Sequence, residues 1–232
     1  YVSFFGGLLM CFLVGLYDDK FNLSPLKKLF LNLFIILTVI LIDDNLVIKS
    51  LSFSFLDNPI ELENISNFFT ILCVLLFINA LNMFDGINFQ AAVYSIVVLI
   101  LIFLKNIYSF YSLILIFTLC LFLFYNFKNK SFLGDSGTQI LSFVISFILI
   151  KGYNVEKSIQ PEEIFIILSF PGLDMFRLFL LRIFDGKHPF SPDINHMHHL
   201  IKFRHNTLYA FLIIQTIILT NIFLYYSLEN KL

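Results

Sequence analysis

The first apolar run of the chain ends at residues 15–20, which read Gly-Leu-Tyr-Asp-Asp-Lys. Residues 1–17 are fit to lie in hydrocarbon, whereas residues 18–28 are polar enough to lie in water. This change predicts a membrane-spanning helix that ends at an interface. Adjacent carboxylates such as Asp18 and Asp19 repel each other and are costly at a membrane boundary. Either they merely close the helix, or they belong to a site that other polar segments complete.

The composition places the chain among membrane proteins. It is 59% hydrophobic and 13% charged, and 31 of its 232 residues are Phe, whereas soluble domains carry about a quarter charged residues. Lipid permits only helices or closed barrels as spanning structures, and continuous apolar runs exclude the alternating pattern of a barrel. The net charge of −1 implies no nucleic-acid partner.

We therefore predict an all-α polytopic membrane bundle of about eight transmembrane helices, which forms a single domain over residues 1–232. The expected spans are roughly 1–17, 28–42, 68–84, 90–104, 108–125, 138–150, 163–184 and 207–226. Some are shorter than the ~20 residues of a straight crossing. The chain starts inside a span without Met, so we expect preceding helices to be missing. Within the loop 43–67, period-two residues ending near 55 suggest a small hairpin.

Counting the crossings brings four polar segments to the same side: residues 18–19, 79–88, 132–137 and 188–199. Ten of the 15 Lys and Arg residues lie on this side. By the positive-inside rule it is the cytoplasmic one. The prediction depends on the number of spans, because one missed or extra span would reverse the later segments.

The third span ends in polar residues at intervals of three. Asn79, Asn82 and Asp85 fall along one helical stripe, and such a stripe faces a cavity or the bundle interior. An interhelical hydrogen-bond seam is the alternative, since Asn side chains join membrane helices. A seam accounts for one Asn more readily than for two Asn and one Asp.

Two glycines flank Asp135 in residues 132–137, Phe-Leu-Gly-Asp-Ser-Gly, at the predicted start of a helix. Free N–H groups there can bind phosphate, although the carboxylate could instead cap its helix. Residues 188–199 hold four of the five histidines together with an Asp and two Pro, which suggests metal or phosphate binding. Carboxylates elsewhere on this face favour a hard cation such as Mg²⁺ over zinc. Lys27 and Lys28 either orient their span or recognise a lipid phosphate.

The motifs at residues 15–20, 23–28, 79–87, 132–137 and 189–199 resemble those of the polyprenyl-phosphate N-acetylhexosamine-1-phosphate transferases, glycosyltransferase family 4. Their order and spacing match over nearly the whole chain. The pattern His-x-His-His after Ser-Pro-x-Asp resembles the branch that uses UDP-N-acetylglucosamine and its relatives. The peptidoglycan branch, which acts on UDP-MurNAc-pentapeptide, carries three consecutive histidines instead.

The resemblance implies transfer of a sugar phosphate from a UDP-N-acetylhexosamine to undecaprenyl phosphate, with release of UMP. Its expected cofactor is Mg²⁺, with Mn²⁺ as an alternative, and Asp135 is the implied metal ligand. Asp18 and Asp19 would serve the acceptor phosphate as catalytic residues, either as a base or as a nucleophile. The remaining implied site residues are Asn82 and Asp85 for the nucleotide, Phe132 near the uracil, and Arg182, His196, His198 and His199 for the cytoplasmic rim. The expected location is a bacterial inner membrane, with a homodimer as one option.

Three departures from the family pattern keep other functions open. Asn88 stands where the family usually has a second Asp, the segment 126–135 lacks the usual Pro, and the first family helices are absent. An inactive family member is therefore one alternative. A membrane transporter is another, but its polar groups should lie near mid-bilayer on broken helices and not at span ends.

Overall fold

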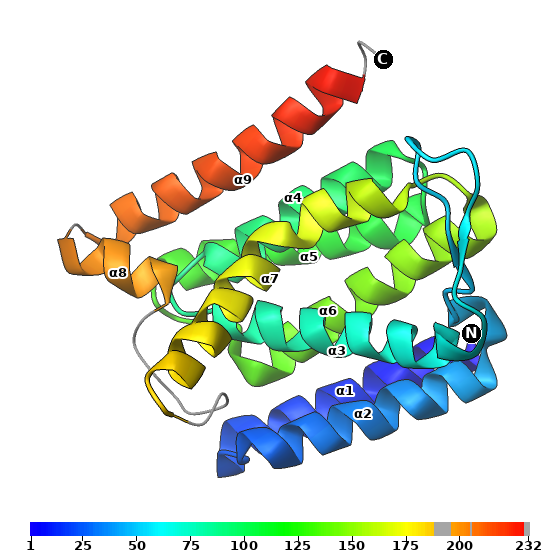
Figure 1. The fold of residues 1–232 in the computed structure, drawn as a ribbon. Coiled ribbons are helices and arrows are strands. Elements are labelled where there is room, and N and C mark those ends of the chain that lie inside the picture. Colours follow the sequence, from blue (N-terminus) through cyan, green and yellow to red (C-terminus); the bar gives the residue numbers. More distant parts are fainter. Residues whose placement is uncertain (188–195, 205, 230–232) are drawn as a thin grey trace.

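The computed structural model of the chain describes residues 1–187, 196–204 and 206–229. Figure 1 shows a bundle of long helices that run back and forth between two ends. The helices are α1 (Val2–Phe21), α2 (Pro25–Ile42), α3 (Ser66–Phe84), α4 (Gln90–Leu104), α5 (Ser109–Phe127), α6 (Gly134–Lys151), α7 (Pro161–Phe184), α8 (Met197–Arg204) and α9 (Thr207–Glu229). Seven are long and apolar enough to cross a membrane, and α4 is a shorter apolar helix of 15 residues. The predicted all-α membrane bundle is confirmed, and each of the eight expected spans coincides with a helix, although α4 is shorter than the length expected of a spanning helix.

The short helix α8 was not expected from the sequence. It has eight residues and follows the long helix α7 after the undescribed residues 188–195. Much of the predicted histidine-rich motif, including its two Pro residues, lies outside the described residues. His196, His198 and His199 lie within the described part.

The loop between α2 and α3 forms the small hairpin that its period-two residues suggested. Strand β1 (Ser50–Leu51) pairs antiparallel with β2 (Ile60–Glu61), so each strand is only two residues long. The phenol of Tyr153, in the π-helical turn Gly152–Glu156, donates a hydrogen bond of 2.8 Å to Ser50 O. It also accepts one of 2.9 Å from Ser52 N. The hairpin is therefore fixed to the end of α6.

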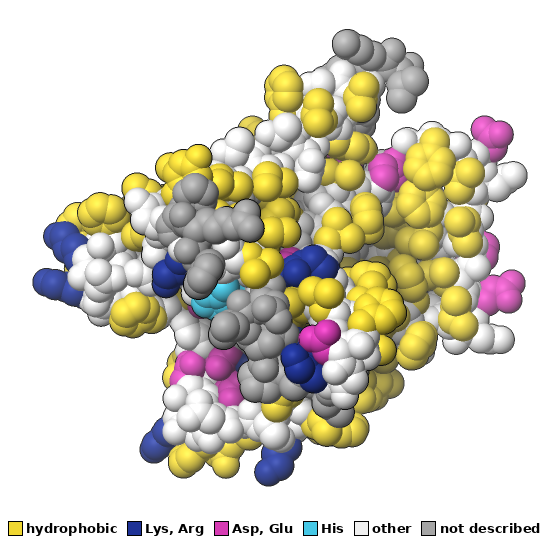
Figure 2. All heavy atoms as spheres, turned by 60° about the vertical axis from the view of Figure 1, so that its left-hand side comes forward, with side chains coloured by type: hydrophobic (Ala, Val, Ile, Leu, Met, Phe, Trp, Pro, Cys, Tyr) yellow, Lys and Arg dark blue, Asp and Glu magenta, His cyan; other side chains and the backbone are white. Residues whose placement is uncertain are grey.

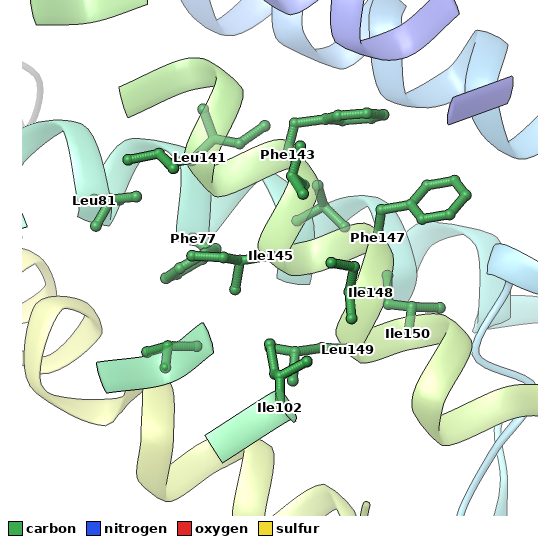
Figure 3. Packing of buried hydrophobic residues seen from close by; sticks show 14 of the residues in the cluster. Phe77, Leu81, Ile102, Leu141, Phe143, Ile145, Phe147, Ile148, Leu149 and Ile150 are labelled. Atoms are coloured by element: carbon green, nitrogen blue, oxygen red, sulfur yellow. The ribbon is translucent and has the colours of Figure 1, made fainter. Parts of the chain in front are cut away.

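Helix α6 is the most buried of the spans. Every residue from Leu141 to Lys151 is buried, and Figure 3 shows its side chains packed among those of neighbouring helices. Lipid tails are as apolar as Leu, so burial of apolar area does not drive this association. Close packing and interhelical hydrogen bonds stabilise membrane bundles instead. The position of α6 thus depends on how closely its neighbours approach.

The closest approach lies between α1 and α6. A Cβ added to Gly15 would stand 2.3 Å from the Cα of Ser136. Small residues permit this proximity of two helix backbones in membranes. Gly15 therefore sets the distance between the end of α1, which carries Asp18 and Asp19, and the start of α6.

Residues 18–19, 79–88 and 132–137, together with the described residues 196–199 of the fourth polar segment, lie at one end of the bundle, as the count of crossings predicted. In Figure 1 the end of α1, the start of α2, the end of α3 and the start of α6 meet on the left-hand side. At the opposite end, Lys151 Nζ lies 2.7 Å from Asp43 Oδ2. Ion pairs therefore join α2 to α6 at both ends of the bundle.

We predict that Gly15→Ala destabilises the protein by about 1–3 kcal/mol, the usual cost of overpacking, because its methyl group would meet the backbone of α6. Thermal unfolding in detergent measures the effect. Gly6→Ala is the matched control, since nothing lies within 4 Å of a Cβ added there. An unchanged melting temperature for Gly15→Ala would mean that the two helices separate without loss of stability.

Candidate active site

The N-terminus of α6 is capped by a carboxylate from another helix. Asp19 Oδ1 accepts a hydrogen bond of 2.7 Å from Asp135 N, and Oδ2 accepts one of 3.1 Å from Ser136 N. The first N–H groups of a helix lack partners within it, and negative charge is favourable there. From the sequence we expected these N–H groups either to bind phosphate or to be capped by Asp135. The structure shows that Asp19 takes two of them.

Gly134 makes this capping contact possible. Its φ of +65° lies in the left-handed region, which favours glycine. A Cβ at this position would also stand 3.0 Å from Asp19 Oδ1. The glycine before Asp135 therefore allows Asp19 to come close to the N-terminus of α6.

Lys28 joins the first acidic pair to Asp135. Its Nζ lies 2.6 Å from Asp18 Oδ2 and 2.5 Å from Asp135 Oδ1. Asp18 is 4% exposed and Lys28 is 9% exposed, and Asp18 Oδ1 accepts a 2.7 Å hydrogen bond from Leu23 N. The predicted phosphate-binding lysine is therefore held between two carboxylates, whereas its neighbour Lys27 is exposed.

Asn82 connects α3 to Asp135 as well. Its Nδ2 donates a hydrogen bond to Asp135 Oδ1 and another, of 3.1 Å, to Thr138 Oγ1. Asn79, the first residue of the predicted polar stripe, instead bonds Leu75 O in its own helix. Asn82 therefore forms the interhelical seam between α3 and α6.

Asp85 lies just beyond the end of α3, outside the membrane span. Burial, followed by the nearby charge of Asp135, raises the pKa of Asp85 to about 7. A cation between the two carboxylates would offset their repulsion. The donor set of Asp135 and Asp85 fits Mg²⁺, which typically uses one or two carboxylates together with substrate phosphates.

No larger metal-binding group occurs in the part of the chain that the structure describes. There, three or more His, Cys, Asp or Glu side chains do not gather closely enough to hold a metal ion. Among the described residues, the histidines therefore do not form a zinc centre. Mg²⁺ at Asp135 would depend on oxygens from the substrates.

The three described histidines of the motif stack beside the turn after α3. The rings of His196 and His198 lie 5.2 Å apart at 14°, and those of His198 and His199 lie 4.3 Å apart. A Cβ added to Gly86 would stand 1.8 Å from His198 Nε2. Burial and then the neighbouring histidines lower the pKa of His198 to about 4, so its ring is neutral at neutral pH.

The remaining predicted residues lie around this centre in different ways. Phe132 precedes α6 and is 68% exposed, whereas Arg182 near the end of α7 is 5% exposed. The guanidinium of Arg182 lies 6.0 Å from the ring centre of Phe179. Figure 2 shows carboxylates next to a histidine on this face, with Lys and Arg side chains around them.

Two residues of this end were missed by the sequence reasoning. Asn126 accepts a 3.1 Å hydrogen bond from Phe89 N and donates one of 2.7 Å to Ser131 O, which joins the loops after α3 and α5. Asp174 lies within α7 and contacts the start of α8. A carboxylate inside an apolar span was a signal that could have identified Asp174. Asn126 gave no comparable signal.

Comparison with known proteins agrees with this arrangement. The family profile described as "Glycosyl transferase family 4" matches residues 1–153. The chain belongs to this family. It is similar to the undecaprenyl-phosphate alpha-N-acetylglucosaminyl 1-phosphate transferase of Escherichia coli strain K12, with 26% identity over 200 residues, 81% of this chain and 54% of the relative.

Other family members give similar matches. The chain is 28% identical over 207 residues to the enzyme of that name from Yersinia pestis, covering 81% of this chain and 54% of the relative. It is 30% identical over 203 residues to the probable undecaprenyl-phosphate N-acetylglucosaminyl 1-phosphate transferase of Bacillus subtilis strain 168, covering 83% and 56%. The chain spans about half the length of the curated relatives it matches.

We predict that Lys28→Met destabilises the fold by about 3–5 kcal/mol, the range for breaking a buried ion pair, because two carboxylates would lose their shared cation. Lys27→Met is the matched control, as this neighbouring side chain is exposed. Chemical denaturation in detergent compares the two variants. Equal stability of both would show that Asp18 and Asp135 do not require Lys28.

Proposed function

We propose that the protein transfers N-acetylhexosamine-1-phosphate from a UDP-sugar to undecaprenyl phosphate. An oxygen of the acceptor phosphate attacks the β-phosphorus of the UDP-sugar, the bond between the two donor phosphates breaks, and UMP leaves. The observation that carries the proposal is the convergence of Asp19, Lys28 and Asn82 on Asp135 at one end of the bundle. The names of the relatives support the substrate class.

The acceptor side of the site is formed by Asp19 and Lys28. Both carboxylates are engaged by protein groups, but the side chain of Asp18 is buried, whereas that of Asp19 is exposed. We therefore assign contact with the acceptor phosphate to Asp19, and to Asp18 the positioning of Lys28. The Lys28 ammonium can stabilise negative charge as the phosphates approach each other. Direct attack needs no covalent enzyme intermediate, because a deprotonated phosphate is itself a nucleophile.

The donor side is formed by residues from the turn after α3, the loop before α6 and the helices α7 and α8. Asn82 and Asp85 line the nucleotide pocket, and the exposed ring of Phe132 can stack on uracil. Arg182, His196, His198 and His199 complete the rim. Asp135 and Asp85 would hold Mg²⁺ or Mn²⁺. When bound, the cation supplies positive charge to the diphosphate oxygens.

A cavity of about 490 Å³ between α3 and α7 supports a lipid acceptor. Its lining is almost wholly apolar and extends from Leu51 in the hairpin to Ala80, two residues before Asn82. Phe165 and Phe176 in the lining are exposed, so the cavity opens on the outer surface of the bundle. We assign it to the polyprenyl chain, whose phosphate would then reach the polar end.

The site faces the cytoplasm of a bacterial inner membrane in this proposal. The excess of Lys and Arg at the polar end supports that orientation, and the cytoplasm is where a UDP-sugar is supplied. Asn88, which stands in place of the usual family Asp, donates a 2.6 Å hydrogen bond to Asn129 Oδ1. The asparagine at this position thus has a structural partner. A measurement of transfer activity decides whether the protein is an enzyme or an inactive family member.

We predict that Asp135→Asn lowers the rate of transfer by more than about 100-fold, beyond the usual effect of residues that only support a metal ligand. The measurement is incorporation of labelled N-acetylglucosamine into lipid by membranes that contain the full-length protein. Asp185→Asn is the control, because Asp185 is exposed and its side chain pairs with the exposed Lys187. Near-normal activity with unchanged Mg²⁺ dependence would remove Asp135 from the site.

We predict that Gly172→Phe raises the KM for undecaprenyl phosphate about tenfold, because the ring displaces roughly two buried CH₂ groups of the lipid. Gly172 lines the cavity, and nothing lies within 4 Å of a Cβ added to it. The KM for the UDP-sugar should not change. Gly6→Phe, on α1, is the matched control with equal free space. Similar lipid KM values for both variants would place the prenyl chain elsewhere.

A further inference from the structure

Asp174 is a charged residue that the proposed reaction does not use. It lies on α7 between Leu173 and Met175, and it is 8% exposed. An ionisable side chain inside a membrane span is costly and marks a functional position with a specific partner. The partners of Asp174 therefore indicate what it does.

The two oxygens of Asp174 contact different elements. Oδ1 accepts hydrogen bonds of 2.7 Å from Arg177 Nη2 and 3.2 Å from Arg177 Nε, one turn along α7. Oδ2 lies 3.4 Å from Met197 N and 3.5 Å from His196 Nδ1, at the start of α8. Arg177 thus neutralises the carboxylate, while the second oxygen faces the histidine segment.

The contact with Met197 N caps the N-terminus of α8. The first N–H groups of a helix lack partners within it, and a carboxylate at that end is favourable. The contact with His196 fixes the ring that stacks on His198 at 5.2 Å. His198 in turn fills the space beside Gly86, where an added Cβ would stand 1.8 Å from its Nε2.

We propose that Asp174 is a positioning residue that holds the histidines of α8 against Gly86. These contacts connect α7, through His196 and His198, to the turn that carries Asp85. The consequence for catalysis rests on the proposed function: the histidines form the wall of the donor pocket, so release of α8 weakens binding of the UDP-sugar. The acceptor phosphate, which we assign to Asp19 and Lys28, is not part of this histidine wall. Leu173 and Met175 line the cavity assigned to the prenyl chain, so we expect a smaller effect on the lipid acceptor than on the UDP-sugar.

The experiment compares Asp174→Asn with Asp174→Glu in the full-length protein, with Asp185→Asn, at the C-terminal end of the same helix, as the control. The first readout is modification of His196, His198 and His199 by diethyl pyrocarbonate, followed by mass spectrometry. Loss of the charged hydrogen bond from Met197 N, and of the nearby contact with His196, should raise the rate of modification about tenfold in Asp174→Asn. The rate should remain low in Asp174→Glu and unchanged in Asp185→Asn.

The second readout is kinetic. Asp174→Asn should raise the KM for the UDP-sugar without a matching change in the KM for the lipid acceptor, and Asp174→Glu should restore it in part. A merely structural role would lower the amount of folded enzyme and leave both KM values unchanged. Such a result would overturn the proposal.

A further variant covers the case in which Asp174→Asn does not fold because Arg177 keeps an unmatched charge. The double substitution Asp174→Asn with Arg177→Gln removes both charges of the pair. Wild-type histidine reactivity in this variant would also overturn the proposal. Increased reactivity in a protein whose wild type transfers no sugar phosphate would support Asp174 as a positioning residue while contradicting the proposed function.

Discussion

The ion pair between Lys28 and Asp135 is the interaction on which the polar end of the bundle depends. An isolated charge in a region of low dielectric constant is strongly disfavoured, and removal of one partner leaves the other uncompensated. Lys28 lies 2.6 Å from Asp18 and 2.5 Å from Asp135, so one ammonium serves two acidic segments. Asn82 adds α3 to the same carboxylate. The end of α1, the start of α2, the end of α3 and the start of α6 are thereby held together.

A second ion pair gives this arrangement its frame. Lys28 and Asp135 are 107 residues apart in sequence, and Asp43 and Lys151, at the other end of the same two helices, are 108 apart. Helices α2 and α6 therefore run parallel and keep nearly the same register from one end of the bundle to the other. Such a frame fixes the ends of α6, and α6 carries Asp135. Preorganised charges of this kind can stabilise a transferring phosphoryl group without reorganisation during the reaction.

The sequence predicted the spans, their number and the end at which the polar segments meet, because apolar runs and the alternation of crossings determine these features. It also identified Asp19, Lys28, Asn82 and Asp135. It did not predict that Asp19 caps α6 or that Lys28 lies between two carboxylates, since both depend on the distance between helices. Gly15 determines one such distance, but a glycine in an apolar run does not reveal which backbone will approach it. The contact between α7 and α8 was missed for the same reason, because Asp174 was read only as part of a span.

The central claim is that this polar end transfers a sugar together with its phosphate, and the fate of the donor's β-phosphorus tests it most directly. UDP-N-acetylglucosamine labelled with ³²P in the β-phosphate is incubated with undecaprenyl phosphate, Mg²⁺ and membranes that contain the full-length protein. Our account predicts that the label enters the lipid fraction as a sugar diphosphate ester and that the released UMP is unlabelled. Label that remains in UDP, or that appears only in a water-soluble sugar phosphate, would contradict it.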